Sequence, residues 1–163
     1  MTLSIFLIIV LPITLLLVVL LPKTTAGKPK FYSDSKYFEL VRKYSILTGI
    51  SKARLLTHIS IESNFNTNAK NPSDPSYGLM GITSLIGKHY AGVKDFELYN
   101  PENNIKAGSY FLKDLDRKYR LSPEHIAEIY NLGETKYNAG LRSPDYRKKF
   151  LDRIKFFENI VKK

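Results

Sequence analysis

An apolar run at residues 3–22 divides the chain into two parts with different physical requirements. The run, LSIFLIIVLPITLLLVVLLP, carries no charged side chain. About 20 apolar residues span the hydrocarbon core of a bilayer, and Pro12 is tolerated in such a helix. We therefore predict a transmembrane anchor at residues 1–22, a linker at residues 23–36, and one compact domain at residues 37–163.

A cleaved secretory signal is the alternative interpretation of the same run. Signal peptides place positive side chains before a shorter apolar core, but the first positive side chain here is Lys23, which follows the run. The residues from Thr24 to Ala26, before Gly27, offer only a weak cleavage site. We therefore favour a retained anchor.

The charge of the chain lies entirely beyond residue 22 and is strongly positive. The net charge is +10, which attracts polyanions such as nucleic acid, anionic lipid or an acidic cell-wall polymer without choosing among them. There is no cysteine, and the three histidines are scattered, so disulfides are excluded. His58 lies one helical turn before Glu62, but no third ligand follows at a suitable spacing. We expect a packed or solvated histidine and no metal or other cofactor.

Helical periodicity and helix-start signals dominate the predicted domain, where no alternating pattern predicts a strand. Two Ser-Pro-acid triplets, at Ser122 and Ser143, are typical of helix N-termini. Residues 64–77, rich in Asn, Ser, Asp and Pro, predict a long loop. The predicted helices cover residues 37–48, 52–63, 82–90, 103–119, 123–132 and 144–161. The domain should therefore be mostly α-helical.

Glu62 is the residue that the local pattern singles out. It follows Leu55 and Ile59 at spacings of four and three, which places a carboxyl on the apolar face of the predicted helix. Burial would raise its pKa above the reference of about 4.3, as a general acid near neutral pH requires. The competing interpretation is a solvated or ion-paired glutamate at a helix end. The polar loop that follows favours the first interpretation, because a cleft wall is expected there.

Four short motifs occur in an order typical of a known family. They are IESNFN at residues 61–66, GLMGI at 78–82, NPENNIKAG at 100–108 and IYNLG at 129–133, and Pro144-Asp145-Tyr146 extends the match. In order and spacing they resemble the lytic transglycosylases of the soluble-lytic (SLT), goose-lysozyme-like type, over roughly residues 38–157. The resemblance implies a lysozyme-like helical domain. With the apolar run, the chain is expected to be mostly α, with one N-terminal transmembrane helix.

The resemblance also implies roles for individual residues. Glu62 would be the single catalytic acid/base, and Tyr130 would approach and orient its carboxyl. The substrate-binding positions would be Ser63, Gly78, Leu79, Met80, Ile82 and Asn131. Gly108 would permit close helix packing, and no cofactor or metal would take part.

Three features depart from the family pattern. The family usually has glutamine where this chain has Gly81, which removes a group that can contact sugar. The usual tyrosine is Phe111 here, which suits a packing role. A second Tyr-Asn pair at Tyr137 has the more typical local letters, but Tyr130 fits the spacing and the helix better.

The reaction implied by the resemblance is cleavage of the β-1,4 bond between N-acetylmuramic acid (MurNAc) and N-acetylglucosamine (GlcNAc) in peptidoglycan, with formation of a 1,6-anhydro end. One carboxyl suffices in this reaction because the acetamido group of the substrate assists. Asp74 and Glu97 are candidates for a second acid by residue type only, since neither lies in a matching motif. The alternatives are a goose-type lysozyme, which hydrolyses the same bond, and an inactive wall-binding module. A nucleic-acid-binding protein is suggested by the positive charge only, and the sequence contains no recognised nucleic-acid-binding motif. We therefore expect no nucleic-acid partner.

The expected partners are peptidoglycan glycan strands and, through residues 3–22, a membrane. The catalytic domain is expected to face the cell wall. Lys23, Lys28 and Lys30 follow the apolar run, however, and the positive-inside rule would keep that side in the cytoplasm. A phage virion membrane, or release by another route, would remove this conflict.

Overall fold

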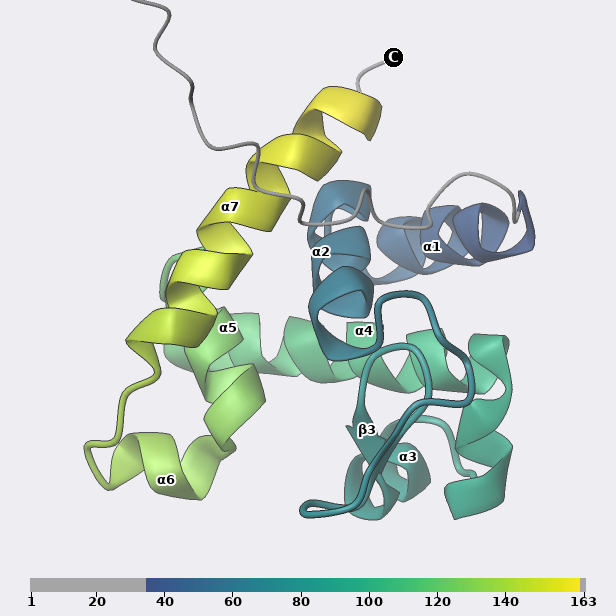
Figure 1. Ribbon diagram of the computed structural model, residues 1–163, viewed down its shortest axis with the longest axis horizontal. Helices are drawn as coiled ribbons and strands as arrows, with labels where there is room; N and C mark the ends of the chain where they lie inside the picture. Colours follow the sequence, from purple (N-terminus) through teal and green to yellow (C-terminus); the bar gives the residue numbers. More distant parts are fainter. Residues whose placement is uncertain (1–34, 162–163) are drawn as a thin grey trace, which may run out of the picture.

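The computed structural model describes residues 35–161, so the predicted anchor at residues 3–22 lies outside the described residues. Helices make up most of the described chain (Figure 1). In chain order the elements are α1 (Ser35–Thr48), α2 (Lys52–Glu62), β1 (Lys70–Asn71), β2 (Ser76–Tyr77), β3 (Ile82–Thr83), α3 (Ser84–Tyr90), the 3-10 helix η1 (Asp95–Tyr99), α4 (Pro101–Tyr119), α5 (Pro123–Leu132), α6 (Glu134–Asn138) and α7 (Pro144–Val161). Within residues 35–161, no helix is both long enough and apolar enough to cross a bilayer.

The helix-start signals of the sequence set several helix boundaries. α5 and α7 begin at Pro123 and Pro144, as the Ser-Pro-acid triplets predict. Proline fits the first helical position because its fixed φ suits the helix and its missing N–H needs no partner there. α4 begins at Pro101, before the predicted start, because the Asn100 side chain accepts hydrogen bonds from N–H groups of the first turn, the shorter at 2.9 Å.

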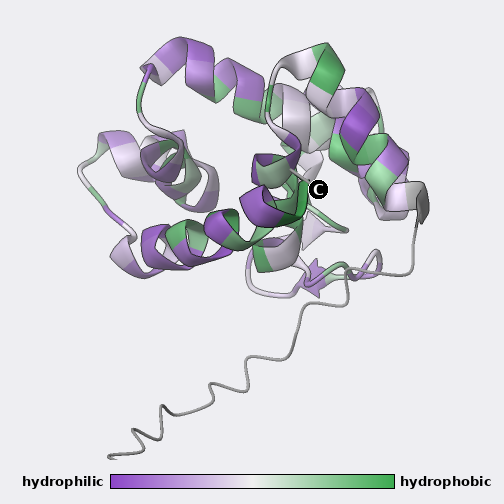
Figure 2. Ribbon diagram, turned by 90° about the horizontal axis from the view of Figure 1, so that it is seen from above, coloured by the Kyte–Doolittle hydropathy of each residue, from purple (hydrophilic) through white to green (hydrophobic). Residues whose placement is uncertain are grey.

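α2 forms the centre of the molecule. Its residues from Ala53 to Ser60 are all buried, and it packs against α7 and α1 (Figure 1). α1, α3 and α5 in turn pack on the long helix α4. Figure 2 shows hydrophobic and hydrophilic residues interleaved along the outer helices, as amphipathic helices around a common core require. The largest side chains of this core that are fully buried include Leu55, Ile59, Leu112 and Phe157.

A small antiparallel sheet differs from the prediction of an uninterrupted loop at residues 64–77. Its strands β1, β2 and β3 are two residues long and pair in this order, with Tyr77 opposite Lys70 on one side and Ile82 on the other. Strands this short contain no alternation that could be recognised in the sequence. The short helices η1 and α6 were not predicted either.

Candidate active site

Glu62 is the last residue of α2, and the packing of this helix fixes its position. Ser51 caps the helix by accepting a hydrogen bond from the Arg54 N–H at 3.2 Å. The Arg54 guanidinium donates two hydrogen bonds to Asp116 of α4, at 2.6 and 2.7 Å. Glu62 is partly exposed, whereas the preceding turns of α2 are buried. The carboxyl is therefore presented at the end of a rigid, fully packed helix.

The environment of Glu62 favours its protonated form. Burial raises the pKa of Glu62 from 4.5 to about 7, against the opposing effect of a hydrogen bond from Tyr146. The C-terminal end of a helix carries partial negative charge, which also disfavours a carboxylate. Near neutral pH both protonation states of Glu62 are therefore populated, as a group that must donate and then accept a proton requires.

Tyr146 of α7 donates a hydrogen bond to Oε1 of Glu62. Its hydroxyl oxygen also lies 3.5 Å from Nδ1 of His58. Burial raises the pKa of Tyr146 well above its ordinary value, so the hydroxyl remains a donor. His58 is fully buried, burial lowers its pKa well below the ordinary value, and its ring lies 4.5 Å from that of Tyr130. His58 is thus a neutral, packed residue behind Tyr146.

Tyr130 of α5 lines the groove with Glu62, but its hydroxyl donates to the carbonyl oxygen of Met80 at 2.7 Å. In the described part of the chain, the hydroxyl that bonds Glu62 belongs to Tyr146 and not to Tyr130. Tyr146 belongs to the segment that extends the family match, but no role in the site was predicted for it, because a contact across 84 positions leaves no local pattern. The other candidate, Tyr137, lies on α6, where the Arg142 guanidinium stacks 4.1 Å from its ring centre.

The turn of residues 78–81 forms the wall beside Glu62. Gly78 and Gly81 have φ values of +71° and +59°, a region that favours glycine. A Cβ atom on Gly81 would lie 2.9 Å from Oε2 of Glu62, and one on Gly78 would lie 2.4 Å from the carbonyl oxygen of Leu98. Glycine is therefore favoured at both positions, because φ is positive and because there is no space for a Cβ atom. Where the family usually has glutamine, Gly81 leaves space for the Glu62 carboxyl.

Three helices hold this turn through its backbone. Ser63, at the end of α2, donates to the carbonyl oxygen of Leu79 at 2.8 Å. Tyr130 of α5 bonds the Met80 carbonyl, and the buried Asn104 of α4 accepts from the Met80 N–H at 2.7 Å. The side chains of Leu79 and Met80 are fully buried. These side chains face the core rather than the groove, because burial of apolar surface draws them inward. Contact of Leu79 and Met80 with substrate stays a prediction.

The groove beside Glu62 consists of two adjoining cavities of about 380 and 210 Å³. The residues that line both are Glu62, Asn71, Ser76 and Gly81. Among the other predicted site residues, Ile82, Tyr130 and Asn131 line the larger cavity and Gly78 the smaller. The larger cavity is also lined by Asp74, a second acid by residue type only. Within residues 35–161, no cluster of three or more His, Cys, Asp or Glu side chains could hold a metal ion.

The fold and the groove define a lysozyme-like helical domain with a protonatable carboxyl that lines its groove. Residues 39–152 match the family model described as Transglycosylase SLT domain. The chain belongs to this family, which confirms the resemblance seen in its motifs.

Curated relatives include the membrane-bound lytic murein transglycosylase C of Photorhabdus laumondii, which is 33% identical over 120 residues. The protein of the same name from Yersinia pestis is 32% identical over 120 residues. Both matches cover 66% of this chain and 32% of the relative, so the chain spans about a third of the length of these relatives.

Solved structures with a similar fold include the 70-kDa soluble lytic transglycosylase in complex with bulgecin A. Its TM-score is 0.59 at 20% identity, over 73% of this chain and 21% of that one. The 70-kDa soluble lytic transglycosylase of Escherichia coli has a TM-score of 0.58 at 21% identity, over 74% and 21% of the two chains. These likenesses confirm the predicted mostly helical, lysozyme-like fold.

Proposed function

We propose that this domain is a peptidoglycan lytic transglycosylase that cleaves the MurNAc–GlcNAc β-1,4 bond and leaves a 1,6-anhydro-MurNAc end. Glu62 is its single acid and base. The observation that carries the proposal is a carboxyl with a pKa raised to about 7 that lines two adjoining cavities. Membership of the family, and relatives named lytic murein transglycosylases, support it.

In the first step, protonated Glu62 gives its proton to the glycosidic oxygen, and the bond between this oxygen and C1 of MurNAc breaks. The GlcNAc unit leaves with the proton on its 4-hydroxyl. The carbonyl oxygen of the 2-acetamido group of MurNAc bonds to C1 and stabilises its positive charge. Tyr146 holds Oε1 of Glu62, so Oε2, on the side of Gly81, is the oxygen directed toward the sugar.

In the second step, the Glu62 carboxylate takes the proton of the 6-hydroxyl of the same MurNAc. O6 then bonds to C1 while the bond from the acetamido oxygen breaks, which closes the 1,6-anhydro ring. Glu62 returns to its protonated form, and neither water nor a cofactor is consumed. A pKa near 7 suits both steps, because the donor and acceptor forms then differ little in free energy.

The residues around Glu62 divide into sugar contacts and supports. Gly78, Ile82 and Asn131 line the groove and are assigned to substrate binding. Ser63 supports the turn that forms the groove wall, because its hydroxyl donates a hydrogen bond to the Leu79 carbonyl oxygen. The cavity of about 380 Å³ is within the range of small-ligand sites.

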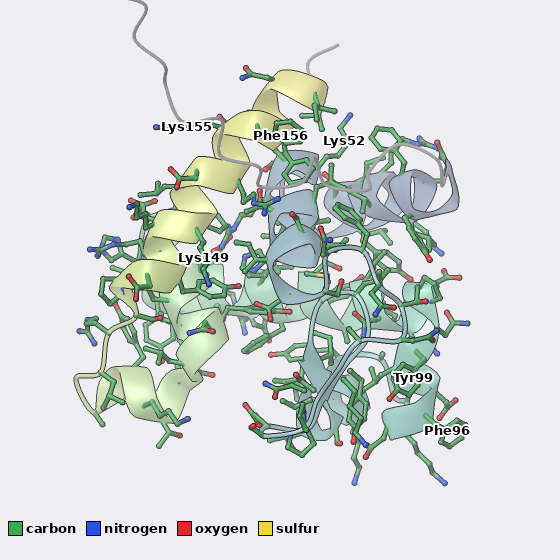
Figure 3. All side chains as sticks on the ribbon, viewed as in Figure 1. Lys52, Phe96, Tyr99, Lys149, Lys155 and Phe156 are labelled. Atoms are coloured by element: carbon green, nitrogen blue, oxygen red, sulfur yellow. The ribbon has the colours of Figure 1, made fainter. Side chains whose placement is uncertain are left out.

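A basic surface supports attraction to the wall polymer. The net charge of +10 favours binding near the carboxylates of peptidoglycan. Figure 3 shows Lys149 and Lys155 along α7, and both are exposed. Attraction of this kind is non-specific and weakens as salt screens it.

Product analysis tests the proposal. Purified sacculi are digested with the full chain in detergent and, in parallel, with Glu62→Gln, and the soluble products are identified by mass spectrometry. Anhydro-muropeptides from the wild type and none from the variant are expected. Absence of products from both proteins, with sacculi still bound, would refute the enzyme and leave the wall-binding alternative.

Hydrolysis by a goose-type lysozyme mechanism is the second candidate, and Asp74 is the observation that favours it. Asp74 lines the larger cavity together with Glu62, and a second carboxylate is what hydrolysis through an activated water requires. Hydrolysis gives reducing ends instead of anhydro rings. If Asp74→Asn still releases anhydro-muropeptides at the wild-type rate, Asp74 has no catalytic part and the transglycosylase stands.

We further propose that residues 3–22 anchor the chain in a membrane, with the domain on the side of the wall. The run has the length of a bilayer span, and the relatives are named membrane-bound. Alkaline extraction of membranes should leave the full chain in the pellet and release a chain that lacks residues 1–22. Cleavage of the domain by protease added to intact spheroplasts would support the orientation, and protection from it would contradict it.

A further inference from the structure

His58 is the polar side chain buried directly behind the proposed acid. It lies in α2, one helical turn before Glu62, and is 0% exposed. Its ring packs against the rings of Tyr130 on α5 and Phe150 on α7, with ring centres 4.5 and 5.4 Å apart. Among the described residues, Nε2 of His58 has no hydrogen-bond partner. A buried polar ring costs free energy unless it forms a hydrogen bond, so Nδ1 is the atom through which His58 can act.

The contact of Nδ1 determines which ring nitrogen of His58 carries the proton. Nδ1 lies 3.5 Å from the hydroxyl oxygen of Tyr146, and this hydroxyl donates its single proton to Oε1 of Glu62. An ionised carboxylate only accepts hydrogen bonds, so the Tyr146 oxygen can only accept from His58. The ring proton must then lie on Nδ1. A proton on Nε2 would place two lone pairs opposite each other and leave a buried N–H group without a partner in the described chain.

The same tautomer persists when Glu62 gains its proton. Burial, followed by the charge of Arg54 one helical turn earlier, lowers the pKa of His58 well below its ordinary value, so the ring takes up no second proton. Transfer of its one proton to Nε2 would need a path to an atom enclosed by the core. The Tyr146 hydroxyl therefore faces an N–H group on its His58 side and can donate only to Glu62.

The other titratable groups around this contact are engaged elsewhere or exposed. The Tyr130 hydroxyl of α5 donates to a carbonyl oxygen of the turn at residues 78–81. The Arg54 guanidinium is paired with Asp116 of α4. Asp74, which lines the larger cavity, is exposed. The direction of the hydrogen bonds is thus set by the His58 ring.

We infer that His58 is a positioning residue, whose Nδ1–H group keeps the Tyr146 hydroxyl directed at Oε1 of Glu62. This inference rests on the proposed function. Because Oε1 accepts from Tyr146 in both protonation states, the acid proton is carried by Oε2, the oxygen on the side of Gly81. Without a donor at position 58, protonated Glu62 could instead donate from Oε1 to Tyr146, which would hold the proton away from the glycosidic oxygen.

Nuclear magnetic resonance of the full-length chain in detergent, with isotope-labelled histidine, tests the tautomer. The two neutral forms of imidazole differ in their nitrogen shifts and in the couplings to the ring protons. The His58 signal is assigned by its loss in His58→Asn, and the exposed His89 provides a titrating reference. His58 is expected to stay neutral, with its proton on Nδ1, as pH passes through the Glu62 pKa of about 7. A proton on Nε2, or exchange between the two nitrogens, would overturn the inference whether or not the chain cleaves peptidoglycan.

Three substitutions on α2 test whether His58 acts through Tyr146. His58→Leu removes the donor, whereas His58→Asn has nearly the shape of leucine and keeps an N–H donor close to the position of Nδ1. Thr57→Val is the matched control, because it removes a fully buried hydroxyl that bonds the Ala53 carbonyl oxygen at 2.8 Å and not the site. Each substitution is made in the wild type and in Tyr146→Phe, and thermal unfolding identifies any variant with a folding defect.

In the wild-type background, His58→Leu is expected to lower kcat for anhydro-muropeptide release about fivefold, the factor that one neutral hydrogen bond represents, with KM unchanged. His58→Asn should recover most of this loss, and Thr57→Val should change neither constant. In Tyr146→Phe, His58→Leu should have no further effect, because the hydroxyl through which it acts is gone. An equal loss in both backgrounds would make His58 a packing residue and overturn the inference, as would no loss in either.

A titration of the Glu62 carboxyl separates this inference from the proposed function. If the wild type releases no products, the proposed function fails, but the carboxyl can still be followed by magnetic resonance of carbon-labelled glutamate. The pKa of Glu62 should be about half a pH unit higher in His58→Leu than in the wild type, because a less polarised Tyr146 hydroxyl stabilises the carboxylate less. In Tyr146→Phe the same substitution should leave the pKa unchanged. Equal pKa values in His58→Leu and wild type would overturn the inference.

Discussion

Replacing Tyr146 with phenylalanine removes the hydroxyl that holds Glu62 and keeps the ring. The Tyr146 ring is 7% exposed and packs with Ala127 and Phe150, so its apolar contacts persist in the variant. The hydrogen bond from Tyr146 lowers the pKa of Glu62 against the effect of burial. Without this bond, the pKa is expected to rise above its wild-type value of about 7.

The size of the rise follows from the difference between the two protonation states. A hydrogen bond contributes about 1.5–3 kcal/mol with a charged partner and about 1 kcal/mol with a neutral one. The difference of roughly 1–2 kcal/mol corresponds to about one pH unit, since one unit is 1.36 kcal/mol. Glu62 must be protonated to begin the reaction, so kcat/KM falls as pH rises through its pKa. The alkaline limb of the profile should therefore move up by about one pH unit.

Initial rates of anhydro-muropeptide release, measured across neutral pH, provide the assay. Tyr130→Phe is the matched control, because its hydroxyl bonds the Met80 carbonyl and not Glu62. Tyr130→Phe should lower the maximal rate, because the turn that forms the groove wall loses a hydrogen bond. It should leave the alkaline limb of the pH profile unchanged. A limb that coincides in Tyr146→Phe and wild type, or one that moves in Tyr130→Phe instead, would refute the reasoning.

Three other substitutions probe the same framework. Glu62→Gln is expected to stabilise the fold at alkaline pH by up to about 3 kcal/mol, because the wild type loses about 1.4 kcal/mol per pH unit as pH rises from 4.5 to about 7; identical thermal unfolding there would contradict this. Gly81→Ala places a Cβ atom 2.9 Å from Oε2 of Glu62, so kcat should fall about tenfold or more while circular dichroism stays unchanged; an unaltered kcat would argue against crowding at the carboxyl. Asp116→Asn leaves Arg54, whose side chain is 7% exposed, without its counter-charge and should cost about 3 kcal/mol in urea unfolding; a stable variant would show that the pair is dispensable.

Helices could be predicted from the sequence where their start signals are local. Ser51, Pro123 and Pro144 mark starts that the structure confirms. The two-residue strands, η1 and α6 could not be predicted, because their formation depends on contacts with the rest of the fold. Periodicity led to Glu62, yet α2 is buried on all sides from Ala53 to Ser60 rather than along one stripe. The prediction reached the right residue although the helix is less one-sided than the pattern suggests.

Residues of the candidate site could be predicted where they belong to a short sequence motif. Contacts between residues that are distant in the sequence could not be predicted. Glu62 and the turn that begins at Gly78 were found from local letters. The contact from Tyr146 and the support by Asn104 arise when α7 and α4 pack against α2 and the turn, which no local spacing reveals. Leu79 belongs to the same motif as Gly78, but a motif does not indicate which of its side chains face inward.

The turn at residues 78–81 is fastened to α2, α4 and α5 through Leu79 and Met80 backbone atoms. The position of this turn is therefore determined by the relative placement of the three helices and not by the sequence of the turn itself. Small displacements between those helices change the width of the groove before they unfold the domain. Core substitutions remote from Glu62 can then reduce the proposed activity in a protein that is still folded, and the tolerance of this domain to mutation is set by how well its helices keep their spacing.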